Sequence, residues 1–158
     1  MLETEIIDAL IYRIQQEQLS SRIYEQMSIW FDLRGYKNLA KLYNKYAHEE
    51  LSHAEWAKKF LLSYNENFQL QPLEAPNAAF SGVSEILQLT LEHEQEITNQ
   101  CNELAKLASS LQNYPCFELA LKFCREQVEE LEKAFDLVDM YTLSNNDLLF
   151  EHSIENLL

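Results

Sequence analysis

The stretch His48-Glu49-Glu50-Leu51-Ser52-His53 places two polar side chains, Glu50 and His53, on rows of residues that are otherwise apolar and repeat every seven positions. The two rows are Tyr43, Glu50, Ala57, Tyr64 and Leu39, Tyr46, His53, Phe60. Because residues three apart share one face of a helix, both side chains converge on one point. A buried carboxylate must be paired, hydrogen-bonded or bound to a metal. The stretch therefore predicts a long helix with a ligand pair on its core face.

Three other segments carry the same kind of interruption at matching depth. Glu17 interrupts the first, Glu94 the third, and Gln127 with Glu130 the fourth. Their rows are Leu10, Glu17, Tyr24, Phe31; Leu87, Glu94, Cys101, Ala108; Ala120, Gln127, Ala134, Tyr141; and Cys116, Phe123, Glu130, Leu137. Four buried carboxylates at one level would repel one another without a cation between them. This pattern predicts a di-metal site inside a four-helix bundle, where such sites are built from inward-facing carboxylates.

The spacing of breaks along the chain predicts an all-α, up-down bundle in a single domain spanning 1–158. Only 2 glycines and 3 prolines interrupt it, which favours long helices. The four main segments and a short C-terminal helix are expected at about 3–33, 36–64, 81–111, 113–143 and 147–158. The stretch 65–80 contains Pro72 and Pro76 and is expected to form a long crossover between the second and third helices, with Ser81 capping the third.

Composition excludes several classes of protein. The formal net charge of −14 disfavours binding to nucleic acid or to an anionic membrane surface. No apolar run is long enough to cross a bilayer, and the acidic N-terminus does not resemble a secretory signal. Three cysteines without a C-x-x-C pair predict free thiols rather than a disulfide framework. We therefore expect a cytoplasmic protein.

The donor set determines what the predicted centre can bind. Oxygen-rich sites with one imidazole suit iron, manganese or zinc. We expect Glu50 to bridge two ions. Glu17 and His53 would complete the first ion, and Glu94 with Glu130 the second. Gln127 is a poor metal ligand, and we expect it to orient a water or a bound oxygen species by a hydrogen bond.

Three acids flank the predicted centre, and a tyrosine lies two turns from Glu17. Glu49, Glu126 and Glu129 either form a solvated acidic face or join Glu130 in a third cation site. Tyr24 is either a core tyrosine whose hydroxyl finds a partner or a one-electron donor to oxidised iron.

Taken together, these motifs resemble those of bacterial non-haem ferritins over nearly the whole chain. The motifs that carry the resemblance are Glu17 with Tyr24, His48-Glu49-Glu50-Leu51-Ser52-His53-Ala54, Leu91-Glu92-His93-Glu94-Gln95, Tyr114-Pro115, and Glu126-Gln127-Val128-Glu129-Glu130. The resemblance implies a hollow shell of about 24 subunits. Within it, Fe²⁺ is oxidised by O₂ or H₂O₂ and stored as a ferric mineral, and the short fifth helix lies at a four-fold axis.

The resemblance also implies a role for each matching residue. Glu17, Glu50, His53, Glu94 and Glu130 match the ferroxidase centre, with Gln127 beside it. The residues that match a third iron site are Glu49, Glu126, Glu129 and Glu130. Tyr24 matches a redox-active tyrosine.

Some positions depart from related families. Ser52 stands where haem-binding bacterioferritins have a methionine, so no haem is expected. The fourth segment has Gln127-x-x-Glu130 in place of their second Glu-x-x-His. Lys122 stands where bacterial ferritins often have an aromatic residue near the centre.

Three other functions stay open at the level of sequence. One is a shell that stores iron without catalysis, and another is a di-metal oxidase that acts on a small molecule. The last is a helical interaction protein without metal.

Overall fold

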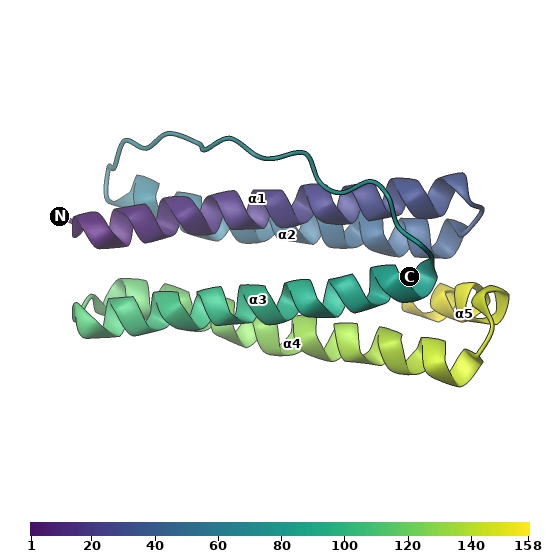
Figure 1. Ribbon diagram of the computed structural model, residues 1–158. Helices are drawn as coiled ribbons and strands as arrows, with labels where there is room; N and C mark the ends of the chain where they lie inside the picture. The colour runs from purple at the N-terminus through teal and green to yellow at the C-terminus, as the bar shows by residue number, and fades with distance from the viewer.

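The computed structural model describes residues 1–158 and is entirely helical. Four long helices form the bundle, and a short helix with a 3₁₀ turn follows at the C-terminus (Figure 1). The bounds are α1 Thr4–Leu33, α2 Lys37–Ser63, α3 Val83–Ser110, α4 Tyr114–Ser144, α5 Asp147–Ser153 and the 3₁₀ turn Ile154–Leu157. None of these helices combines the length and the apolar character that crossing a bilayer requires.

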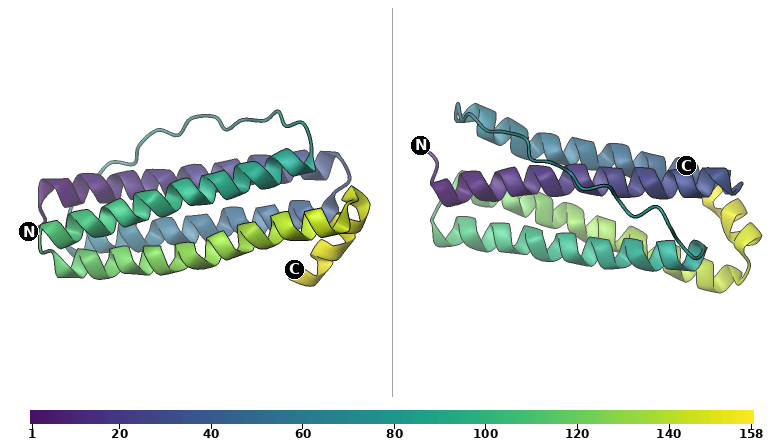
Figure 2. Two further views of the ribbon diagram at one scale, coloured as in Figure 1. Left: turned by 60° about the horizontal axis from the view of Figure 1, so that its bottom comes forward. Right: turned by 45° about the horizontal axis from the view of Figure 1, so that its top comes forward.

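The helices associate as two antiparallel pairs, α1 with α2 and α3 with α4 (Figures 1 and 2). A tight turn joins α1 to α2 through Gly35, whose φ of +86° lies in the left-handed region that glycine adopts without strain. A second turn joins α3 to α4. Between the pairs, the crossover carries the chain back along the whole length of α1, so α2 and α3 run in the same direction.

Contacts along its length hold the crossover on the bundle. Phe68 packs against the apolar cluster near the N-terminus of α1, and Phe80 packs against the cluster at the other end. Between them, the Gln15 side chain donates a hydrogen bond of 2.9 Å to the Pro72 carbonyl. The segment is thus a returning connection of the predicted kind.

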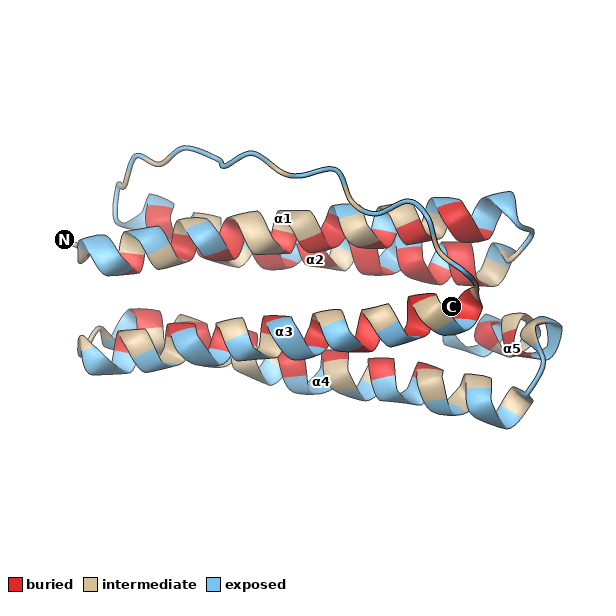
Figure 3. Ribbon diagram, in the orientation of Figure 1, coloured by how far each residue is buried: buried red, intermediate tan, exposed pale blue.

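The apolar core is divided into two clusters, one toward each end of the bundle. Buried residues lie along the inner faces of all four long helices (Figure 3). Between the two clusters lie the six polar side chains that interrupt the apolar rows. All six are buried: Glu17, Glu50, His53, Glu94, Gln127 and Glu130.

The observed helix ends lie close to the expected ones, with one correction at α3. The N-cap residue of α3 is Gly82 and not Ser81. The Ser81 hydroxyl instead donates to the Glu85 carboxylate at 2.6 Å. The start of α4 follows the expected chemistry, because the Asn113 side chain accepts a hydrogen bond from the Cys116 backbone amide at 3.1 Å and Pro115 lies in the first turn.

Candidate metal centre

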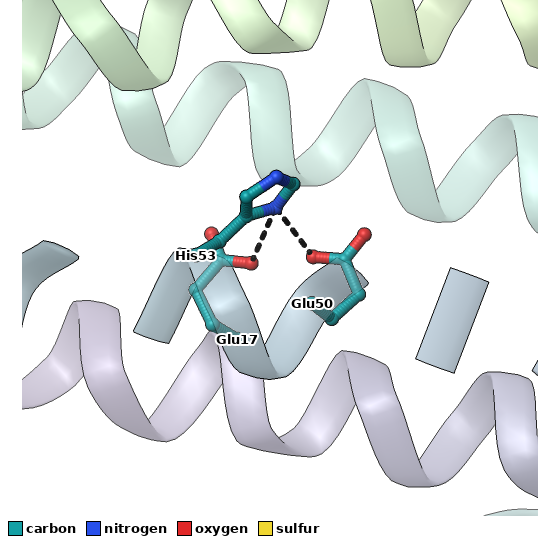
Figure 4. A group of neighbouring side chains, drawn as sticks. All are labelled: Glu17, Glu50 and His53. Carbon is teal, nitrogen blue, oxygen red and sulfur yellow. Dashed lines mark hydrogen bonds and ion pairs between the residues drawn. The ribbon is translucent and has the colours of Figure 1, made fainter. Parts of the chain in front are cut away.

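Two triads of buried ligand-type side chains share Glu50 at the middle of the bundle. The first is Glu17, Glu50 and His53, and the second is Glu50, Glu94 and Glu130. In each triad, one potential ligand atom per residue lies within 4.8 Å of the others. In Figure 4 the Glu17 and Glu50 carboxylates both face one ring nitrogen of His53. This is Nδ1, at 3.8 Å from Glu17 Oε2 and 3.2 Å from Glu50 Oε2. The arrangement matches the pairing expected from the sequence.

Glu17 has a partner that the sequence reasoning missed, the guanidinium of Arg13. Arg13 is only 2% exposed and lies one turn earlier on α1, with Nε 3.1 Å from Glu17 Oε1. The two side chains form an ion pair without an aligned hydrogen bond. Both Glu17 oxygens lack a hydrogen-bond partner, and so do Nε and Nη2 of Arg13. Buried oxygens without a donor are costly in a folded protein. They are, however, well suited to bind a cation.

Both oxygens of Glu94 are held by donors from neighbouring helices. The Tyr24 hydroxyl of α1 donates to Oε1. Gln127 Nε2 of α4 lies 2.9 Å from Oε2 and 3.2 Å from the Thr98 hydroxyl. These contacts fix the orientation of the Glu94 side chain. Tyr24 and Gln127 therefore both hold the carboxylate of Glu94, a predicted metal ligand.

Burial is the main cause of the raised pKa values of the carboxyl groups in this layer. It raises the pKa of Glu17 well above the ordinary value, and the neighbouring Glu50 raises it further, although Arg13 opposes the shift. Burial likewise raises the pKa of Glu50 to about 8 and that of Glu130 to about 7, with Glu94 adding repulsion to both. Such shifts are expected when several carboxylates share a site of low dielectric. The layer therefore favours either protons or metal cations.

The four carboxylates predicted to form a third cation site do not share one partner. Lys133 Nζ lies 3.7 Å from Glu49 Oε2 and 3.4 Å from Glu130 Oε1. Glu126 Oε1 instead lies 3.4 Å from His53 Nε2. Glu129 is exposed and takes part in no hydrogen bond or ion pair. The third site stays a prediction, and Lys133 is a second neighbour that the sequence reasoning missed.

An aromatic ring reaches the centre from α2. Trp56 packs against His53, with 4.8 Å between ring centroids, and against Phe123 at 5.2 Å. The Lys122 ammonium lies 4.1 Å from the centre of the Trp56 ring. Lys122 thus contacts an aromatic ring on the neighbouring helix, and the two form a cation–π pair beside the His53 ligand.

This chain is similar to known proteins in both sequence and fold. The family model described as Ferritin-like domain matches residues 7–142. A bacterial non-heme ferritin of Escherichia coli O157:H7 is 34% identical over 145 residues, covering 91% of this chain and 87% of that protein. A bacterial non-heme ferritin of Staphylococcus epidermidis strain ATCC 12228 is 28% identical over 148 residues, covering 93% and 89%.

Solved structures agree with these relatives. The chain of an open pore ferritin from the archaeon Archaeoglobus fulgidus superposes with a TM-score of 0.93 at 25% identity, and the match covers 98% of each chain. The likeness therefore extends over all helices, the short C-terminal one included. Together with the family match over most of the sequence, it shows that this chain belongs to the ferritin family.

Proposed function

We propose that this chain oxidises Fe²⁺ at the paired site and stores the ferric product inside a shell built from copies of itself. The observation that carries the proposal is the pair of buried triads that share Glu50. Glu17 and His53 would bind the first ion, Glu94 and Glu130 the second, and Glu50 both. Carboxylate oxygens stabilise Fe³⁺ more than Fe²⁺, which favours loss of an electron from each ion.

Pairing the ions determines the stoichiometry of the reaction. Two Fe²⁺ give up two electrons to one O₂, so that 2 Fe²⁺ + O₂ + 2 H⁺ yield 2 Fe³⁺ + H₂O₂. With peroxide as the oxidant, 2 Fe²⁺ + H₂O₂ + 2 H⁺ yield 2 Fe³⁺ + 2 H₂O. In both cases the electrons move in pairs, and no superoxide is released.

The small space beside the centre favours this function over a small-molecule oxidase. A cavity of about 10 Å³ lies among Tyr24, Glu94 and Glu130. That volume suits a water-sized molecule, whereas organic ligands occupy pockets of hundreds of Å³. A shell that only stores iron would not need the buried donors, yet all of them are present.

Assembly and location complete the proposal. The likeness to the Archaeoglobus ferritin chain over its whole length supports a shell of many subunits, for which we propose roughly 24. The cysteines Cys101, Cys116 and Cys124 are unpaired. Free thiols fit the reducing cytoplasm that we propose as its location.

Stopped-flow titration with Fe²⁺ in air tests the proposal, on protein whose mass is measured by light scattering in the same sample. We expect a fast ferric phase that saturates at two Fe²⁺ per subunit. Glu130→Ala should slow this phase at least about tenfold, because the second ion loses a ligand. Glu132→Ala is the matched control, since Glu132 is exposed on the same helix. A large shell without a fast phase would reduce the function to storage, and a small oligomer with one would favour an oxidase.

A further inference from the structure

Lys133 holds a positive charge between the proposed iron pair and the surface of the bundle. It follows Glu130 by one helical turn on α4, and its Nζ lies 3.4 Å from Glu130 Oε1. The same Nζ lies 3.7 Å from Glu49 Oε2 on α2. The ammonium thus joins a buried ligand of the iron pair to a half-exposed carboxylate of the neighbouring helix.

The three side chains differ in their burial. The side chain of Lys133 is 43% exposed and that of Glu49 is 31% exposed, whereas that of Glu130 is only 6% exposed. A lysine ammonium is charged at neutral pH, and its two ion pairs hold this charge beside Glu130 and Glu49.

Two cavities meet at Lys133. The inner one is the cavity of about 10 Å³ beside Tyr24, Glu94 and Glu130. The outer one has a volume of about 130 Å³ and is lined by Glu49, Lys45 and Asp136 among others. Lys133 lines both, together with Tyr46 and Leu137, and of these three side chains only that of Lys133 is a cation.

The remaining acids do not close around another position. Glu126 is directed to His53 Nε2 at 3.4 Å, and Glu129 is exposed without a partner. Only Glu49 and Glu130 converge, and the atom on which they converge is Lys133 Nζ. A divalent ion bound there would have to displace this ammonium and would be repelled by it.

We propose that Lys133 is a tethered cation that takes the place of a third iron ion, so that each subunit binds two iron ions and not three. This inference rests on the proposed function, because it presumes that the neighbouring pair site binds iron. Lys133 acts here through Glu49 and Glu130, as a residue that sets the number of ions. A lysine ammonium suits this role because it is a compact point charge on a flexible stem.

Calorimetric titration of the assembled protein with Zn²⁺, and with Fe²⁺ under anaerobic conditions, tests the inference. We expect two ions per subunit for the wild type and for Lys133→Arg, which keeps the charge. Lys133→Gln should bind three, because the two carboxylates lose their counter-charge. Lys45→Gln is the matched control, since it removes a charge from the same outer cavity, and it should bind two.

Anomalous diffraction from Zn²⁺-soaked crystals of Lys133→Gln locates the additional ion. We expect it between Glu49 and Glu130. Three ions in the wild type, or two in a folded Lys133→Gln shell, would overturn the role of Lys133 and leave the iron pair intact. Fewer than two ions in the wild type would overturn both this inference and the proposed function.

Discussion

At the scale of single residues, Arg13 determines how Glu17 is accommodated in the core. Arg13 lies on a seven-residue row that is buried throughout: Ile6, Arg13, Ser20 and Met27. Its guanidinium is always charged, so its burial requires an anion. Glu17 provides that anion at 3.1 Å. The test of apolar rows that revealed Glu17 would have revealed Arg13 as well, had it been applied to basic side chains.

Replacement of Arg13 should destabilise the chelator-treated protein in a manner that depends on pH. Arg13→Gln removes the counter-charge of Glu17, and we expect a loss of about 3–5 kcal/mol where the carboxyl group is ionised. Because burial raises the pKa of Glu17 and lower pH favours the neutral carboxyl, the loss should be smaller at pH 5 than at pH 8. Urea unfolding at the two pH values measures the difference. Arg22→Gln, exposed on the same helix, should have little effect at either pH, and equal losses for Arg13→Gln at both values would contradict the charge pairing.

Tyr24 acts on the centre through its hydrogen bond to Glu94. Tyr24→Phe removes one of the two donors that orient this ligand and leaves the ring packing in place. We expect the variant to bind two ions per subunit and to oxidise Fe²⁺ about three- to tenfold more slowly, the range that one hydrogen bond spans. Stopped-flow absorbance measures the rate. Tyr43→Phe is the control, because Tyr43 is equally buried but its hydroxyl pairs with Thr90. An unchanged rate in Tyr24→Phe would show that Glu94 does not need this donor.

At the scale of helices, α4 begins with a side-chain cap and α3 does not. The Asn113 side chain caps α4 through the Cys116 amide, and its Nδ2 also donates to Glu3 near the start of α1 at 2.9 Å. Gly82 begins α3 without any side-chain cap. The sequence predicted a capping residue at Ser81 and a helix start at about 113. The difference arises because the backbone continues one residue farther at α3, which leaves the Ser81 hydroxyl free to contact Glu85.

These starts should respond differently to alanine. Asn113→Ala should lower the free energy of unfolding by about 1 kcal/mol, because the first turn of α4 loses its cap. Ser81→Ala should change it by less than about 0.5 kcal/mol, as at other surface positions. Denaturant midpoints of the two variants provide the comparison. A loss at Ser81 as large as that at Asn113 would mean that the contact with Glu85 contributes as much as a cap.

At the scale of the whole molecule, the polar layer opposes folding unless protons or cations neutralise it. The folded-state pKa values of Glu50 and Glu130, about 8 and about 7, lie above the ordinary value of 4.5. Between pH 4.5 and these folded-state pKa values, the folded protein binds protons that the unfolded chain has released. The stabilising contribution is therefore fully present below pH 4.5 and is lost as the pH rises through about 7 and 8.

Chelator-treated protein should accordingly become less stable as the pH rises from 5 to 8. We expect these groups to contribute about 1 kcal/mol of loss per pH unit for each group still protonated in the fold. Unfolding midpoints across this range measure the slope. Glu130→Gln should flatten the slope between pH 5 and about 7, because an amide does not titrate. A slope that is identical in wild type and variant would contradict the raised pKa of Glu130.

Zn²⁺ should reverse this dependence. A cation that binds only the folded bundle stabilises it by mass action, by about 2.7 kcal/mol at a hundred times its Kd. Binding must displace the protons of the layer, so the gain should grow with pH. Melting temperatures with and without Zn²⁺ at pH 6 and pH 8 test this expectation. A gain that shrinks at pH 8 would show that the ion does not compete with these protons.

The sequence by itself determined the bundle and which polar side chains enter its core. Period-seven rows require four long helices, and an acid within such a row must lie in the core whatever the packing details are. For that reason Glu17, Glu50, His53, Glu94, Gln127 and Glu130 could be placed in one layer before any contact was known. The crossover and the short last helix followed from breaks in the same rows.

Only the tertiary structure decided which partner each charged side chain takes. Long, flexible side chains reach several neighbours from one backbone position, and the choice depends on the packing of other helices. Arg13 pairs with Glu17 inside the core, and Lys133 reaches across from α4 to Glu49 on α2. A residue's position in a seven-residue row identifies whether its side chain is buried. The partner that a lysine or glutamate side chain takes at the edge of the core depends on charges that come together only when the helices pack.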